Sequence, residues 1–220
     1  MQIQITYDQE RDIENIIKAT SSKNSSKPTS FQKEYIELHG NSFEHERVRS
    51  FLNLYHNKHG VSLDHELSRI RREWSEIKKE AIDRLTRIFN IMLEDQLIAY
   101  LTTDSRCTYN TRDGYFFVSF TSTSNPPNLI ILHELLHFYT WEKYHDNLIN
   151  RGVSEKKYND LKESLTVLLN IEFADLLSGH LDIGYLQHQE MRKQITDLHQ
   201  QGNDLDAVLS IMSTEDSNLY

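Results

Sequence analysis

The chain has 220 residues, of which 26% are charged and 38% are hydrophobic, and its formal net charge is -9. This balance is typical of a folded globular protein and too apolar for wholesale disorder. The acidic excess argues against the clustered Lys and Arg that phosphate contacts require, so we expect no nucleic-acid partner.

Three further features of the sequence indicate a cytoplasmic protein without a membrane partner. No apolar run reaches the ~18 residues that a bilayer span needs. The first residues, MQIQITYDQE, carry acids where a signal peptide would carry a basic and then an apolar stretch. Cys107 is the only cysteine, so no intramolecular disulfide can form, which fits a reducing compartment.

The first hundred residues predict a helical region with one short strand. IQITY has the alternation of a strand, and DIENIIKA after it has helical spacing. The polar, Ser-rich segment 21–30 predicts a loop, and the next helix is expected over 43–55. From 63 to 92 apolar residues recur in steps of three and four, which is typical of one long helix that packs against a core.

The remaining chain predicts a small sheet followed by helices. QLIAYLTT and YFFVSFTS are expected to be strands of an antiparallel sheet. Pro126 and Pro127 favour a helix start, and this helix should extend to about Asn150. A further continuous helix is expected from about Ser154 to Ser178, and the last forty residues predict one or two surface helices around Gly202. The expected fold class is therefore α+β, mainly α, with regions 1–100 and 101–220 in one compact unit.

The segment NPPNLIILHELLHFYTW, residues 125–141, contains the pattern that indicates a function. His133, Glu134 and His137 form H-E-x-x-H within an otherwise apolar helix. Burying three titratable groups is costly unless something compensates for them, and a metal ion would do so. Side chains at i and i+4 project from one face of a helix about 6 Å apart along its axis, so both imidazoles can reach one Zn²⁺. Glu134 can then reach a water molecule that the metal holds.

This segment resembles the zincin metallopeptidases, and the third ligand decides the branch. Metzincins continue the motif with a glycine and a third histidine, but Thr140 and Lys143 stand at those positions. In gluzincins, the thermolysin-like branch, the third ligand is a glutamate on the following helix, and the resemblance assigns that role to Glu163. Glu172 is the alternative ligand, and Asp160 is a weaker one.

The resemblance also implies groups around the ligands. Val167 replaces the acid that in gluzincins orients a histidine ligand, and Thr166, Asn170 or Asp175 could take that role. YFFVSFTS would be the edge strand that holds an extended substrate. A residue that stabilises the oxyanion would be found among four downstream candidates: Tyr139, His180, Tyr185 and His188.

We therefore expect a zincin-like zinc metallopeptidase that acts on a peptide or protein substrate. His133, His137 and Glu163 would bind Zn²⁺, and Glu134 would be the general base. Two alternatives stay open. One is a zinc hydrolase of a non-peptide amide or ester, and the other is a non-catalytic, zinc-stabilised binding or regulatory protein.

Overall fold

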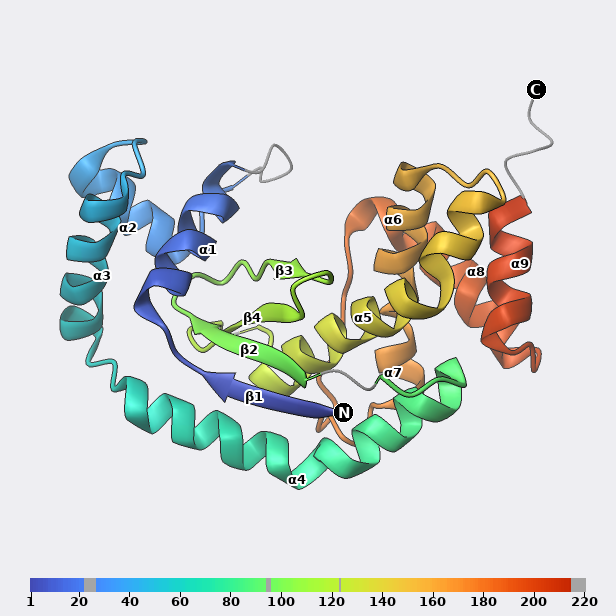
Figure 1. Cartoon of the computed structure of the whole chain (residues 1–220). Coiled ribbons are helices and arrows are strands. Elements are labelled where there is room, and N and C mark those ends of the chain that lie inside the picture. Colours follow the sequence, from blue (N-terminus) through green and yellow to red (C-terminus); the bar gives the residue numbers. More distant parts are fainter. Residues whose placement is uncertain (22–26, 94–95, 123, 215–220) are drawn as a thin grey trace. The chain divides into compact units, whose positions relative to one another are not determined.

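The structure, a computed structural model, describes residues 1–21, 27–93, 96–122 and 124–214 (Figure 1). Helices make up most of the described chain, together with a four-stranded sheet, so the expected α+β, mainly α class is confirmed. Part of the loop expected at 21–30, namely 22–26, lies outside the described residues. Among the helices that the structure describes, none has the length and apolar character to cross a membrane.

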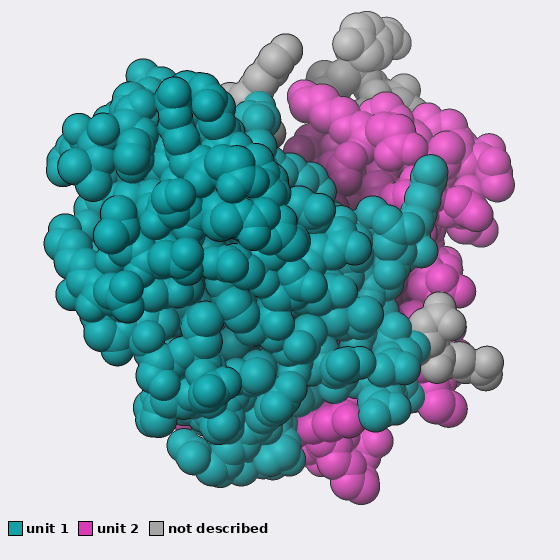
Figure 2. Space-filling view, turned by 60° about the vertical axis from the view of Figure 1, so that its left-hand side comes forward, with its two compact units in different colours: residues 1–76, 95–131 teal, residues 77–94, 132–220 magenta. Residues whose placement is uncertain are grey.

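Two compact units, coloured separately in Figure 2, interleave along the sequence. The first unit comprises 1–76 and 95–131, and the second comprises 77–94 and 132–220. Two long helices, α4 (Leu63–Phe89) and α5 (Pro127–Asn150), contribute residues to both units. The expected division into regions 1–100 and 101–220 of one compact unit stays a prediction.

The sheet belongs to the first unit and has the strand order β1-β2-β4-β3. The bounds of β1 to β4 are Gln2–Thr6, Gln96–Thr102, Tyr109–Asn110 and Tyr115–Ser119. Both β1 and β4 run parallel to β2, whereas β3 is antiparallel to β4, so the prediction of an antiparallel sheet is wrong. Alternation of side chains indicates a strand but carries no information on the direction of its neighbour. The direction follows from the connection 103–114, which is long enough to return the chain for a parallel pair.

The strand YFFVSFTS, expected to be the edge strand that holds a substrate, corresponds to β4. Its first two residues are paired on both sides and do not form a free edge. Tyr115 and Phe116 pair with β2 on one side and with β3 on the other. The two-residue β3 escaped prediction because it is too short to show a period.

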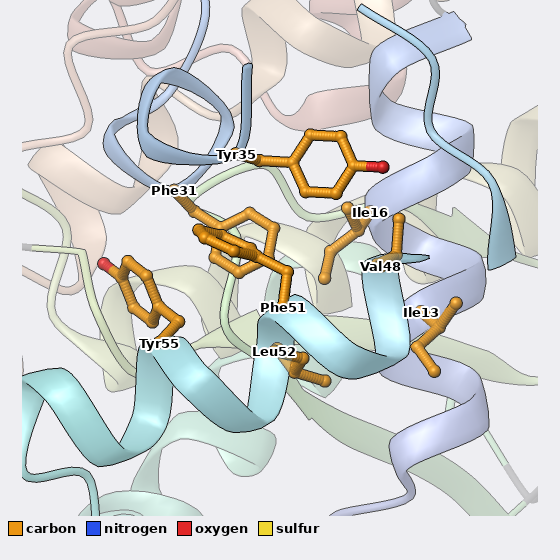
Figure 3. Close-up of a cluster of buried hydrophobic side chains, with 8 residues drawn as sticks. All are labelled: Ile13, Ile16, Phe31, Tyr35, Val48, Phe51, Leu52 and Tyr55. Carbon is orange, nitrogen blue, oxygen red and sulfur yellow. The ribbon is translucent and has the colours of Figure 1, made fainter. Parts of the chain in front are cut away.

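Three helices of the first unit form a buried apolar cluster, which is drawn in Figure 3. They are α1 (Gln9–Ser21), α2 (Ser30–His39) and α3 (His45–His59). The cluster comprises Ile13, Ile16, Phe31, Tyr35, Val48, Phe51, Leu52 and Tyr55. Helix α2 was not predicted, although Thr29 and Gln32 form a capping box at its start. Such a reciprocal pair satisfies two backbone donors and is a recognisable helix signal.

Helix α4 confirms the long helix expected from residue 63, but it ends three positions before Met92. Asn90 adopts φ 51 directly after the helix ends at Phe89. Asparagine tolerates this left-handed conformation better than most residues, so it provides a natural stop.

The second unit contains the remaining helices, and the continuous helix expected from 154 to 178 is wrong. The chain instead forms α6 (Glu155–Leu165) and the short α7 (Leu168–Glu172). Between them the Thr166 hydroxyl lies 2.8 Å from the Glu163 carbonyl oxygen. Such a local hydrogen bond competes with the helical pattern, and β-branched Thr166 and Val167 add to the tendency to break it.

Two helices close the described chain, as expected around Gly202. A 3-10 turn (Leu186–His188) leads into α8 (Gln189–Gln200), which is followed by α9 (Leu205–Thr214). They are not simply surface helices, because Ile195, Val208 and Met212 are almost fully buried.

Candidate metal centre

Helix α5 presents His133 and His137 on one face, as the i, i+4 spacing predicts. Their ring centroids are 4.6 Å apart and the rings are nearly perpendicular. His137 is 1% exposed, while about a quarter of the His133 side chain reaches solvent. Leu132, Leu135 and Leu136 around them are fully buried, so core packing fixes the helix. The helix backbone that carries the two imidazoles is therefore fixed by core packing.

Helix α6 brings Glu163 to the two histidines. Its carboxylate oxygens lie 3.9 Å from His133 Nε2 and 3.4 Å from His137 Nε2. The three residues offer donor atoms that all lie within 4.8 Å of one another. Donors about 2.0–2.1 Å from a tetrahedral zinc ion lie about 3.3 Å apart. The observed separations therefore approach those of a zinc site, and small side-chain movements would close the difference.

Glu134 lies beside this cluster in a buried environment. Glu134 is 5% exposed, and its Oε2 atom has no hydrogen-bond partner among the described residues. Burial raises the pKa of Glu134 to about 7, and the carboxylates of Glu163 and Asp182 act in the same direction. A buried acceptor of this kind is costly unless a water molecule or another donor satisfies it.

Asp182, which the sequence did not single out, holds His133 from the other side. Its Oδ2 atom is 2.7 Å from His133 Nδ1. Burial alone would lower the pKa of His133, but the hydrogen bond to Asp182 and the neighbouring carboxylates outweigh it and raise the pKa to about 9. With Nδ1–H donated to the carboxylate, Nε2 is the nitrogen that remains for a metal.

The other two candidate ligands have the protonation states that a metal requires. Burial lowers the pKa of His137 to about 4, so its imidazole is neutral at pH 7. Burial opposes ionisation of Glu163, yet His137, Lys162 and His133 together lower the pKa of this carboxyl well below its usual range. A neutral imidazole and an ionised carboxylate are the forms that bind zinc.

Two of the three residues expected to orient a histidine contact Asp182 instead. The Asn170 side chain accepts a hydrogen bond from the Asp182 backbone N–H at 2.7 Å and donates one to its carbonyl at 2.8 Å. Thr166 Oγ1 lies 3.0 Å from Asp182 Oδ1. Asp175 instead forms an ion pair with Arg84. Thr166 and Asn170 therefore contact the aspartate that orients His133, and not the histidine itself.

The alternative third ligands have other partners. Glu172 Oε1 lies 2.6 Å from His199 Nε2, and Asp160 Oδ1 lies 3.1 Å from His188 Nε2. The group of donor atoms that the described residues bring together contains Glu163 rather than either of these.

The four candidates for oxyanion stabilisation occupy varied positions, and their role stays a prediction. Tyr139 is fully buried with its hydroxyl 3.3 Å from Thr86 Oγ1, and His188 contacts Asp160. Tyr185 packs edge-on against the His188 ring, and His180 is exposed.

Lys162 is a second residue near the cluster that sequence reasoning missed. Its side chain is 5% exposed and its Nζ lies 3.5 Å from Glu163 Oε1. The only available signal was adjacency to Glu163, because a lysine on a polar helix normally faces solvent. No sequence pattern indicates Asp182. A helix break and a long turn separate it from Glu163, so no fixed helical spacing relates the two residues.

No protein-family model matches this chain, and comparisons with curated proteins and with solved structures also gave no match.

Proposed function

We propose that this protein is a zincin-like zinc metallopeptidase of the gluzincin type. The observation that carries the proposal is the convergence of His133, His137 and Glu163 on one point, with Glu134 beside them. Two imidazoles and a carboxylate are the protein ligand set of catalytic zinc sites of this type, in which a fourth position stays available.

The surroundings of the cluster support a metal as the missing partner. The donor atoms come from α5 and α6, Glu134 Oε2 is buried without a protein partner among the described residues, and Asp182 lies 2.7 Å from His133 Nδ1. Carboxylates that orient ligating histidines in this way are characteristic of zinc sites. When bound, Zn²⁺ would supply Lewis acidity and lower the pKa of a water molecule.

Glu134 would act as the general base. Its pKa of about 7, raised by burial, places its proton affinity near the operating pH, which is favourable for accepting and returning a proton. It would take a proton from the attacking water and pass it to the leaving amine. Metal binding alone does not require Glu134, so its presence beside the cluster favours catalysis.

Peptide bonds are the proposed substrate because the H-E-x-x-H helix and the downstream glutamate together resemble metallopeptidases. Hydrolysis of another amide or an ester needs the same residues and is the nearest alternative. A zinc-stabilised binding or regulatory protein is the alternative from another class. Cytoplasmic localisation stays a prediction.

A comparison of two Glu→Gln variants on α5 tests the proposal. Glu134→Gln should abolish cleavage of a broad peptide library, with a loss of at least about 10² in rate, while zinc content stays near one per chain. Glu142→Gln, an exposed site on the same helix, should cleave like the unaltered protein.

The possible results distinguish the three candidate functions. Absence of any library cleavage by a zinc-loaded protein would favour the binding protein. Cleavage of ester or small amide substrates alone would favour the other hydrolase. Equal cleavage by Glu134→Gln would contradict the assigned base.

A further inference from the structure

Arg192 is a buried arginine of α8 whose guanidinium lies behind the candidate metal centre. The residue is 4% exposed. Its Nη1 lies 3.0 Å from Asp182 Oδ1 and donates to Thr166 Oγ1 at 2.6 Å, and its Nη2 donates to the Asp182 carbonyl at 2.5 Å. A planar guanidinium can satisfy several acceptors at fixed angles, which an ammonium cannot do.

These contacts place Arg192 one residue away from two of the three candidate ligands. Asp182, which it holds at two oxygens, accepts the Nδ1–H of His133. Thr166, which it contacts at the hydroxyl, lies 2.8 Å from the carbonyl oxygen of Glu163. The Thr166 hydroxyl has one hydrogen, so it donates to Glu163 or to Asp182 while it accepts from Arg192. One side chain therefore links the supports of a histidine and a glutamate ligand.

Gly184 lies against this guanidinium and leaves room for it because glycine has no side chain. A Cβ atom at Gly184 would lie 2.7 Å from Arg192 Nη1 and 2.8 Å from its Cζ, closer than real Cβ contacts. Gly184 also has φ +64, which glycine adopts without strain. A larger residue at this position would therefore strain the backbone and displace the guanidinium of Arg192 from its contacts.

We propose that Arg192 is a positioning residue of the metal centre, which fixes the carboxylate of Asp182 and the end of α6 so that His133 and Glu163 are presented together. This inference rests on the proposed metal site and names a residue that sets its affinity. It implies that docking of α8 and metal binding support each other, because both depend on the same guanidinium.

A purely structural role for Arg192, as an anchor for α8, is the competing explanation, and Arg84 provides the matched control. Arg84 donates to Asp175 at 2.7 and 2.8 Å and to the Glu172 carbonyl at 2.7 Å. It thus anchors α7 with a similar set of contacts, none of which reaches Asp182, Thr166 or the three candidate ligands in the described chain. Loss of an anchor in general should affect both variants equally, whereas loss of a positioning residue should affect only Arg192.

The test measures zinc affinity by competition with a chromophoric chelator for the unaltered protein, Arg192→Met, Arg192→Lys and Arg84→Met. Replacing a group that supports metal ligands typically weakens binding 10–100-fold. We expect a loss of that order in Arg192→Met, a smaller loss in Arg192→Lys, and affinity within about twofold of the unaltered protein in Arg84→Met. In Arg192→Ala, guanidinium ion at low millimolar concentration should restore part of the affinity. The Co²⁺ absorption spectrum should change in the Arg192 variants and not in Arg84→Met.

The possible results distinguish failure of this inference from failure of the proposed function. Folded Arg192 variants that bind zinc as tightly as the unaltered protein would overturn this inference and leave the proposed function intact. Equal losses in Arg192→Met and Arg84→Met would assign Arg192 a structural role and also overturn it. An unaltered protein that binds no zinc would instead refute the proposed function. Should Arg192→Met not fold, Thr166→Val and Gly184→Ala disturb the same contacts, and unchanged zinc affinity in both would overturn the inference.

Discussion

The carboxylate of Asp182 lies 2.7 Å from Nδ1 of His133, on the side of the ring away from Glu163. In the neutral ring, this contact selects the tautomer in which Nδ1 carries the hydrogen and Nε2 presents its lone pair. The same carboxylate is held by Thr166 and Arg192, so its orientation is fixed by the protein and not by the histidine alone.

The first prediction concerns this contact. Asp182→Asn removes the negative charge and leaves an amide that supports the required tautomer less well, so zinc affinity should fall by about 10-fold or more. Zinc competition against a chelator measures the change. A matched substitution at exposed Asp197 on α8 should leave the affinity unchanged. Zinc binding by Asp182→Asn that equals that of the Asp197→Asn control would show that Asp182 does not support the ligand.

The second prediction distinguishes the two glutamates considered for the third ligand. Glu163→Ala should lower zinc affinity by several orders of magnitude, because one of three protein ligands is lost. Glu172→Ala should bind zinc like the unaltered protein, because Glu172 is engaged with His199. Isothermal titration with zinc, or metal analysis after dialysis, separates these outcomes. The reverse ranking would move the third ligand to Glu172.

The parts of the candidate site that follow a fixed local spacing could be predicted from sequence. His133, Glu134 and His137 belong to one helix, and helical geometry alone places them on neighbouring positions of one face. Glu163 required the family resemblance in addition, and the structure brings it to both histidines. Asp182 and Arg192 could not be found, because their positions depend on a break at Thr166 and on the path of a loop that no periodicity encodes.

The fold shows the same distinction between local and non-local information. Helices α1 and α4 follow from apolar spacing and α5 from its paired prolines, and the structure confirms them, together with α3, with shifts at their ends. Strand direction, the interruption between α6 and α7, and the pairing of β3 depend on tertiary contacts. Helix α2 is different, because its capping box of Thr29 and Gln32 is a local signal that the sequence contains.

The third prediction concerns stability against pH through Asp12 in the first unit. Asp12 is fully buried, and its oxygens accept hydrogen bonds from the hydroxyls of Thr102 and Thr103. Burial raises the pKa of Asp12 to about 6, although these hydrogen bonds oppose the shift. In the unfolded chain the pKa is about 3.9. The folded state therefore binds more protons between about pH 4 and pH 6, and stability falls as the pH rises through this window.

The size of this effect follows from the shift of about two units, which corresponds to at most about 3 kcal/mol. Asp12→Asn should reduce the fall in the free energy of unfolding between pH 4 and pH 7, as measured by urea denaturation. Burial also raises the pKa of Asp104, so part of the slope should remain. Glu14→Gln, an exposed site on the same helix, should keep the full slope. Identical slopes for Asp12→Asn and Glu14→Gln would contradict the assignment.

The central claim is that one zinc ion binds between α5 and α6. Crystals of the zinc-loaded protein, measured on both sides of the zinc absorption edge, test it most directly. We predict one anomalous peak per chain about 2.0–2.2 Å from His133 Nε2, His137 Nε2 and a carboxylate oxygen of Glu163. Zinc-loaded crystals without a peak among these three side chains, or with the peak on other residues, would contradict the account.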